Sequence, residues 1–168
     1  MGNALAAAAV ALECGGTPEG VAAALSGAAP ASRWRMEVTD RADGVTVIND
    51  AYNANPESMR AALQALVSIA GPGGRTWAVL GPMGELGDMS AAAHAEVAGT
   101  AADLGVTQLV TVGAPEYGRG RSVADVAAAL DLLRAELEPG DVVLVKASRA
   151  AGLDRFADAL LHDREPVA

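Results

Sequence analysis

The chain has 168 residues, of which 51% are hydrophobic and 3% aromatic, which allows one domain with a real core and a small appendage. Its formal net charge of −9 argues against a nucleic-acid backbone or an anionic membrane surface as partner. The single cysteine, Cys14, excludes an internal disulfide and is typical of a cytoplasmic protein, which is the location we expect.

The chain opens with a pattern typical of two short helices. An alanine-rich run over residues 3–13 predicts a helix that stops at Gly15, and Thr17-Pro18 predicts the start of a second, with Thr17 as its cap. The apolar run within the first helix is too short to span a bilayer and lacks a basic leader, so we do not expect a targeting signal. We assign residues 1–30 to this helical segment and residues 31–168 to the main domain.

In the main domain, β-branched runs alternate with helical patterns. The expected strands cover residues 36–38, 45–48, 76–80, 108–112 and 141–146, and the expected helices cover residues 56–70, 90–104, 122–137 and 153–161. Ser90 and Ser122 are the expected caps of two of these helices. The alternation predicts a three-layer, Rossmann-like α/β domain with a mostly parallel sheet, preceded by the short helical segment.

The stretch from Val45 to Met59 concentrates polar groups where a buried strand gives way to a helix. Asn55 can cap that helix, and Pro56 suits its first turn. Between strand and cap lie Asn49, Asp50, Tyr52 and Asn53. Open α/β sheets bind ligands at the carboxyl ends of their strands, so this cluster is a candidate ligand site. The alternative is a strand–helix turn in which Asp50 and Asn53 bond only to backbone groups.

Residues 50–59, Asp-Ala-Tyr-Asn-Ala-Asn-Pro-Glu-Ser-Met, resemble the D-x-Y-N-A-N-P-x-S-M signature of the Mur ligases. Two later stretches, Leu80–Gly87 and Leu144–Arg149, agree with that family in order and spacing. The resemblance covers nearly the whole chain, but only about the last third of a full Mur ligase. Within the family, it resembles the branch that adds D-alanyl-D-alanine to UDP-N-acetylmuramoyl-tripeptide.

The resemblance implies part of an ATP-dependent, ADP-forming peptide ligase of peptidoglycan precursor synthesis. In that reaction ATP converts a carboxylate to an acyl phosphate, which an incoming amine attacks. The main domain would be the C-terminal domain, which closes over ATP and the dipeptide, and residues 1–30 would be the tail of the central ATP-binding domain. The implied partners are ATP with Mg²⁺, UDP-N-acetylmuramoyl-tripeptide, D-alanyl-D-alanine and the missing N-terminal and central domains, with no nucleic acid and no membrane.

The same resemblance implies two groups of site residues. The nucleotide would face Arg35, Asp50, Tyr52, Asn53 and Asn55. Asp50 would accept hydrogen bonds from the ribose hydroxyls or orient Arg35, and the Tyr52 ring would stack on the nucleotide. The dipeptide carboxylate would be bound by Lys146, Ser148 and Arg149, the alternative being an ion pair that only holds their loop. Ala147 replaces a glycine of the family, so a positive φ there would be strained.

The chain lacks the groups that would energise such a reaction. No G-x-x-x-x-G-K-[ST] phosphate loop occurs, and the single lysine, Lys146, follows a strand. We therefore assign no catalytic residue and expect the chain alone to be inactive. An alternative is a stand-alone nucleotide-binding module, or one that docks on a separate ATP-binding chain and completes its site. A third possibility is a domain that self-associates through residues 3–25.

The remaining motifs predict structure rather than chemistry. The glycines of the Gly81–Gly87 loop do not have dinucleotide-fingerprint spacing, and Pro82 stands where the family usually has an acidic residue. His94 is expected to be a structural hydrogen-bonding group, and with His162 it lacks a third ligand, so we expect no protein metal site. The family has a further helix and strand where this chain has only Gly113–Arg121, so its sheet is expected to be one strand shorter.

Overall fold

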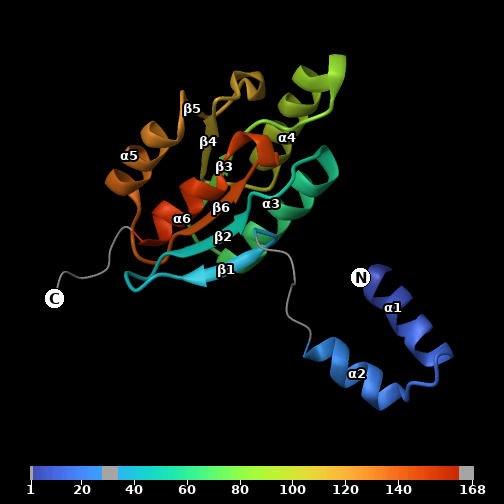
Figure 1. Cartoon of the computed structure of the whole chain (residues 1–168). Coiled ribbons are helices and arrows are strands. Elements are labelled where there is room, and N and C mark those ends of the chain that lie inside the picture. The colour runs from blue at the N-terminus through green and yellow to red at the C-terminus, as the bar shows by residue number, and fades with distance from the viewer. Residues whose placement is uncertain (1, 28–33, 163–168) are drawn as a thin grey trace. The chain divides into compact units, whose positions relative to one another are not determined.

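The computed structural model describes residues 2–27 and 34–162 (Figure 1). The chain divides into two compact units, Met1–Ser32 and Arg33–Ala168. Among the described residues, none of the helices combines the length and the apolar character needed to cross a membrane.

The first unit consists of helices α1 (Gly2–Glu13) and α2 (Pro18–Ser26). The expected cap of α2 is confirmed, because the Thr17 hydroxyl oxygen accepts a hydrogen bond from the Gly20 N–H at 3.2 Å. No residue of α2 is buried, and the side chain of Leu5 in α1 is 70% exposed. Residues 2–27 therefore form no core of their own.

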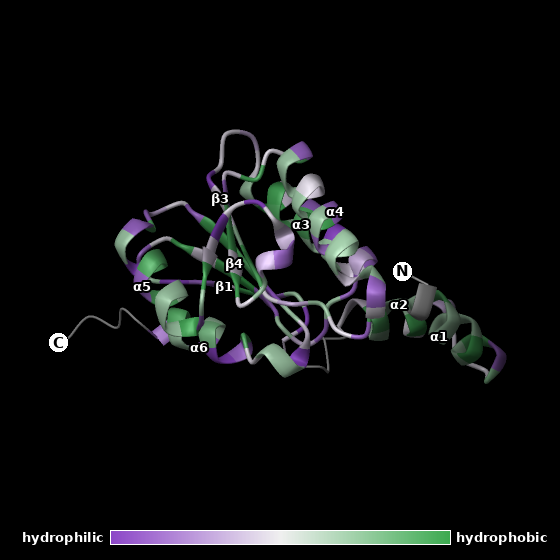
Figure 2. Cartoon of the chain, turned by 90° about the horizontal axis from the view of Figure 1, so that it is seen from above, coloured by the Kyte–Doolittle hydropathy of each residue, from purple (hydrophilic) through white to green (hydrophobic). Residues whose placement is uncertain are grey.

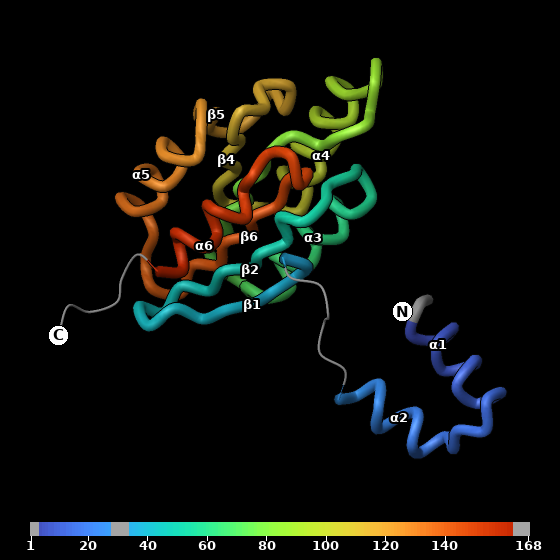
Figure 3. Tube along the Cα trace, viewed as in Figure 1, coloured from blue at the N-terminus to red at the C-terminus, as the bar shows by residue number. Residues whose placement is uncertain are grey.

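The second unit is built on a six-stranded sheet of order β1-β2-β6-β3-β4-β5. Its strands are β1 (Glu37–Asp40), β2 (Thr46–Asp50), β3 (Thr76–Leu80), β4 (Gln108–Val112), β5 (Arg121–Val123) and β6 (Val142–Lys146). β1 pairs with β2 in antiparallel fashion, and all other neighbours are parallel. Figure 3 shows β2 beside β6 although they are distant in the chain, and their register sets Asp50 opposite Lys146.

Helices cover both faces of the sheet, with α3 and α4 on one face and α5 and α6 on the other (Figure 1). Their bounds are α3 (Pro56–Ala70), α4 (Ser90–Asp103), α5 (Val126–Glu136) and α6 (Asp154–His162). Neighbouring strand residues point to opposite faces. Val47 therefore packs against α6 and its neighbours, whereas Ile48 packs on the side of α3. Figure 2 shows the strands as a hydrophobic layer between these helices. The expected three-layer α/β architecture is confirmed.

Two expected caps are wrong, and one strand was not expected. Ser122 lies in β5, and α5 begins only after Asp125, whose carboxylate accepts from the Ala128 N–H at 2.9 Å. Ser90 is the first residue of α4, which follows a 3₁₀ turn, Gly87–Met89, with no side-chain cap. At Ser122 the pairing of β5 with β4 moves the helix start to Val126, whereas at Ser90 the preceding 3₁₀ turn makes the serine the first helical residue instead of the cap.

The link between β4 and β5 is unusually short for parallel neighbours, which normally need a crossover of about a dozen residues or more. It contains a 3₁₀ turn, Pro115–Tyr117, followed by glycines with positive φ at Gly118 and Gly120. A Cβ on Gly120 would lie 2.5 Å from the Leu109 carbonyl oxygen, so only glycine permits this close crossing.

Candidate functional site

The turn after β2 is shaped by its own asparagines. The Asn49 side-chain oxygen accepts from the Ala51 N–H at 3.2 Å, and that of Asn53 accepts from the Ala54 N–H at 2.8 Å. Asn55 and Ser58 form a reciprocal capping box at the start of α3, as the sequence predicts for Asn55. The side-chain oxygens of these three asparagines thus accept from nearby backbone N–H groups, whereas Asp50, the last residue of β2, bonds to groups distant in the sequence.

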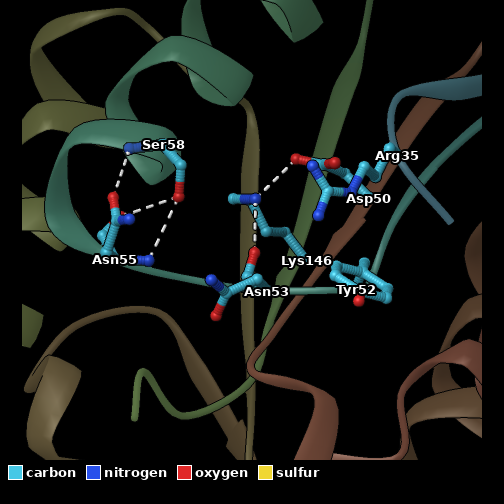
Figure 4. Close-up of a pocket in the computed structure, with 7 residues that line it drawn as sticks. All are labelled: Arg35, Asp50, Tyr52, Asn53, Asn55, Ser58 and Lys146. Carbon is cyan, nitrogen blue, oxygen red and sulfur yellow. Dashed lines mark hydrogen bonds and ion pairs between the residues drawn. The ribbon is translucent and has the colours of Figure 1, made fainter. Parts of the chain in front are cut away.

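The residues expected to face a nucleotide come together at the carboxyl end of the sheet (Figure 4). They line a cavity of about 260 Å³, bounded by Arg35, Asp50, Tyr52, Asn53, Asn55, Ser58 and Lys146. Ser58 was not among the expected site residues, although its place in the Asn-Pro-Glu-Ser motif, one helical turn after Asn55, was the signal that could have shown it. The shared cavity shows that these side chains are neighbours, and their contacts with a ligand stay predictions.

A buried ion pair forms one wall of this cavity. The Lys146 ammonium lies 2.5 Å from Asp50 Oδ2 and 2.8 Å from the Asn53 carbonyl oxygen, as the dashed lines of Figure 4 show. The two side chains are 2% and 13% exposed. A buried ammonium is costly unless a carboxylate and further acceptors satisfy it, and here both are present. The other oxygen of Asp50 accepts from the Met36 N–H at 3.1 Å.

Two arginines stack on the aromatic side chains of this edge. The Arg35 guanidinium lies 4.4 Å from the centre of the Tyr52 ring, and that of Arg149 lies 5.5 Å from Tyr52 and 5.4 Å from Trp34. In the part of the chain that the structure describes, neither arginine forms an ion pair with a carboxylate. Stacked guanidiniums keep their N–H edges free, so this edge suits an anion although the chain as a whole is acidic.

A second cavity, of about 590 Å³, adjoins the loop that follows β6. Its lining includes Trp34, Arg149 and Arg155 but not Lys146. The three residues expected to bind a dipeptide carboxylate are therefore divided: Lys146 lines the first cavity and Arg149 the second. Ser148 lies between them in the chain, and its backbone N–H donates to the Pro82 carbonyl oxygen at 2.9 Å.

Ala147 is buried without backbone strain, because it is not among the residues with positive φ. Its methyl group occupies the space beside Gly81, where an added Cβ would lie only 2.7 Å away. The strain that the sequence led us to consider at Ala147 is thus absent, and Gly81 is the position that must remain small.

The loop that leaves β3 is held by two buried rings. His94 Nε2 accepts from the Met83 N–H at 2.9 Å, so Nδ1 carries the proton and donates to the Ser90 carbonyl oxygen at 2.7 Å. The Tyr117 hydroxyl donates to the Gly81 carbonyl oxygen at 2.9 Å, and its ring meets His94 edge to face at 4.8 Å. Burial, with a further contribution from Glu116, raises the pKa of Tyr117 far above its ordinary value. Both nitrogens of His94 are occupied, which supports its structural interpretation.

Sequence reasoning missed Tyr117, which lies in the short link between β4 and β5. One available signal was a large aromatic residue between two turn-forming positions, Pro115 and Gly118. Across residues 2–27 and 34–162, no three His, Cys, Asp or Glu side chains converge in a way that could hold a metal ion.

The family model for the Mur ligase, glutamate ligase domain, matches residues 34–149. The chain belongs to the Mur ligase family. This Mur ligase chain is 53% identical over 190 residues to UDP-N-acetylmuramoyl-tripeptide–D-alanyl-D-alanine ligase of Mycobacterium tuberculosis, a match that covers 96% of the chain and 37% of the relative. The Bacillus subtilis ligase of the same name is 34% identical, with 95% and 37% covered. The chain therefore spans a little over a third of the length of these curated relatives.

Solved structures agree with this Mur ligase assignment. MurF from Acinetobacter baumannii superimposes with a TM-score of 0.80 at 31% identity, covering 95% of this chain and 36% of that one. MurF from Thermotoga maritima, solved in complex with ADP, gives a TM-score of 0.75 at 27% identity, covering 90% and 35%. The alignment with the mycobacterial relative is longer than this 168-residue chain, so the relative carries residues that the chain lacks. Their location between β4 and β5 stays a prediction.

Proposed function

We propose that this chain acts as the C-terminal domain of an ATP-dependent, ADP-forming ligase that adds D-alanyl-D-alanine to UDP-N-acetylmuramoyl-tripeptide in the cytoplasm. The observation that carries the proposal is the convergence of Arg35, Asp50, Tyr52 and Lys146 on one cavity, in a chain 53% identical to a ligase of that name. The structural match to a MurF solved with ADP supports a nucleotide as the occupant of this edge.

The cavity offers complementary groups for a nucleotide. A guanidinium stacked on Tyr52 leaves donors for phosphate oxygens or an adenine ring, and the asparagines offer further donors and acceptors. Asp50 keeps lone pairs that can accept from ribose hydroxyls. Mg²⁺ would arrive with ATP, since the described residues hold no carboxylate cluster for it.

On the dipeptide side, the proposed carboxylate ligand is Arg149, whose guanidinium is stacked but not ion-paired in the described structure. Ser148 lies beside it in the same loop. Lys146 contributes in a different way, because its ammonium already bonds to Asp50 and to the Asn53 carbonyl oxygen. We propose that Lys146 supports the dipeptide side by fixing the strand end from which Ser148 and Arg149 follow.

In this proposal the domain positions reactants and does not activate them. Holding an amine and an acyl phosphate in one geometry removes much of the entropic cost of their encounter. Helices α1 and α2 would belong to the central ATP-binding domain, since the first unit exposes apolar side chains such as Leu5 and Val10, at 70% and 63%. The catalytic phosphate-binding loop would be supplied by the part of the relatives that this chain does not match.

A complementation experiment tests the proposal. The 168-residue chain is mixed with the M. tuberculosis ligase truncated before the region that matches it, and phosphate release is measured with ATP, UDP-N-acetylmuramoyl-tripeptide and D-alanyl-D-alanine. We expect each polypeptide alone to be inactive and the mixture to be active, with no activity when the chain carries Arg35→Ala. Turnover by the chain alone would contradict the proposal. Nucleotide binding by the chain without complementation would favour the stand-alone binding module.

A further inference from the structure

The segment from Trp34 to Met36, which we call the strap, has an unfavourable backbone. Trp34 has a φ of 61° and Met36 a φ of 49°, so two bulky residues occupy the left-handed region within three positions. Residues other than glycine rarely adopt this conformation, and it persists only where surrounding contacts enforce it. The strap therefore needs anchors, and its central residue is Arg35.

Two anchors come from the end of β2 and from the turn that follows it. The Trp34 carbonyl oxygen accepts from the Tyr52 N–H at 3.2 Å, and the Met36 N–H donates to Asp50 Oδ1 at 3.1 Å. These two bonds lie on either side of Arg35. The first uses only backbone atoms, whereas the second depends on one side chain.

Asp50 is itself held in place. Its second oxygen lies 2.5 Å from the Lys146 ammonium, which is buried and also bonds to the Asn53 carbonyl oxygen. One ammonium thus ties the end of β2 to the turn that follows it. A carboxylate fixed in this way presents its free oxygen to the Met36 N–H in a single geometry.

We propose that Asp50 and Lys146 are positioning residues that latch the strap in its left-handed conformation and thereby present Arg35 to the ligand cavity. The latched backbone places the Arg35 guanidinium 4.4 Å from the centre of the Tyr52 ring, on the lining of the cavity (Figure 4). Release of the Met36 N–H would let the strap relax to negative φ, which would turn Arg35 away from Tyr52.

The latch makes ligand binding and strap conformation mutually dependent. An anionic ligand that contacts Arg35 binds the latched state better, so it must also shift the strap toward that state. By the same linkage, loss of the latch must lower the affinity of the chain for that ligand. The nucleotide identity of that ligand rests on the proposed function, whereas the latch itself does not.

The unliganded chain tests the latch by NMR hydrogen exchange at the Met36 amide. Asp50→Ala is expected to speed this exchange at least tenfold, and Asp50→Asn to have a smaller effect because its amide oxygen can still accept. Lys146→Met should also speed exchange, and Lys146→Arg should restore much of the protection. Met36→Gly should make the amide shift of Arg35 less dependent on Asp50, because glycine holds the strap at positive φ without strain even when the hydrogen bond is lost.

The matched control is Asp141→Asn, which changes a buried carboxylate at the opposite end of the sheet. It should lower the melting temperature without selective loss of protection at Met36. The proposal is overturned if the folded Asp50→Ala and Asp50→Asn chains both keep wild-type exchange at this amide, or if the control exposes it equally.

A second arm uses ADP as the probe, followed through the amide shifts of Arg35 and Tyr52. Saturating ADP is expected to slow exchange at Met36 in the wild type, and Asp50→Ala to weaken ADP binding about tenfold. Binding that leaves Met36 exchange unchanged would overturn the coupling. If ADP does not bind the wild-type chain at all, the assignment of a nucleotide to this cavity loses its support. The exchange data on the unliganded variants still decide whether Asp50 and Lys146 hold the strap.

Discussion

The two ends of the sheet each contain an aspartate paired with a cation, but the pairs are built differently. At the amino end, Asp141 accepts from the Trp77 indole N–H and from the Glu138 N–H, both at 3.0 Å, and its other oxygen lies 3.2 Å from Arg75 Nε. At the carboxyl end, Asp50 bonds to Lys146 and to the Met36 N–H.

The difference lies in what surrounds each pair. The Asp141 side chain is 3% exposed, and its partners join β3 to the turn before β6, so the network closes on itself. The Asp50 side chain is 13% exposed and lines a cavity beside the Arg35 guanidinium, which has no carboxylate partner among residues 2–27 and 34–162. A buried ion pair is therefore weak evidence for a site by itself. The cavity and the unpaired cation distinguish the carboxyl end.

The largest effect on stability is expected at the amino end. Asp141→Ala should lower the free energy of unfolding by about 3 kcal/mol, because the buried Trp77 indole N–H, the partly buried Glu138 N–H and Arg75 lose their acceptor. Urea unfolding followed by tryptophan fluorescence measures it. Glu138→Gln, which alters an exposed partner of Arg75, is the control and should change little. A loss below about 1 kcal/mol for Asp141→Ala would mean that the Asp141 network does not stabilise the fold more than the Asp50–Lys146 pair does.

Lys146→Met is expected to cost less, about 2 kcal/mol, because the Asp50 carboxylate that it leaves unpaired can reach water through the cavity. The same urea titration, extended to Asp50→Asn and the double variant, completes a double-mutant cycle. The double variant should lose less than the two single variants together, since it leaves neither charge unpaired. Additive losses would show that the two groups do not interact.

Tyr117→Phe should lower the free energy of unfolding by about 1 kcal/mol, because the ring stays and only the hydrogen bond to the Gly81 carbonyl oxygen is lost. Tyr52→Phe is the matched control at the carboxyl end, where we expect no change in stability. Equal effects of the two substitutions would remove the structural assignment of Tyr117.

The smallest effect is expected at the surface pair Arg121–Glu136, whose side chains are 44% and 39% exposed. The bond from Arg121 lowers the pKa of Glu136, so the folded chain binds this proton more weakly than the unfolded chain. The pair therefore stabilises the folded chain above the ordinary glutamate pKa of about 4.3. This stabilisation is lost as the pH falls through the lowered pKa of Glu136 in the folded chain. The free energy of unfolding is measured from pH 7 to pH 2. We expect the wild type to be slightly more stable than Glu136→Gln at neutral pH, and the difference in free energy between the two to disappear in acid. A difference in free energy that grows as the pH falls would contradict the lowered pKa of Glu136.

Much of the fold could be predicted because its signals are local. Alternating β-branched runs, Asn55-Pro56 and Thr17-Pro18 mark strands and helix starts through propensity and capping, which act over a few residues. β5 could not be predicted in this way, because it has three residues and exists only through its pairing with β4. The same applies to the wrongly expected caps, because a 3₁₀ turn leads directly into α4 at Ser90 and Ser122 itself lies in a strand.

The candidate site, like the fold, has features that local sequence predicts and features that depend on tertiary pairing. The sequence by itself determined which residue types stand at the carboxyl ends of the strands, since Asp50 and Lys146 each close a recognisable run, and its motifs identified the Mur ligase family. Only the tertiary structure decided that these two side chains neutralise each other, that Arg149 lies apart from Lys146, and that Tyr117 supports Gly81. The physical reason is that strand order and register bring together residues almost a hundred positions apart, and no local preference encodes that pairing.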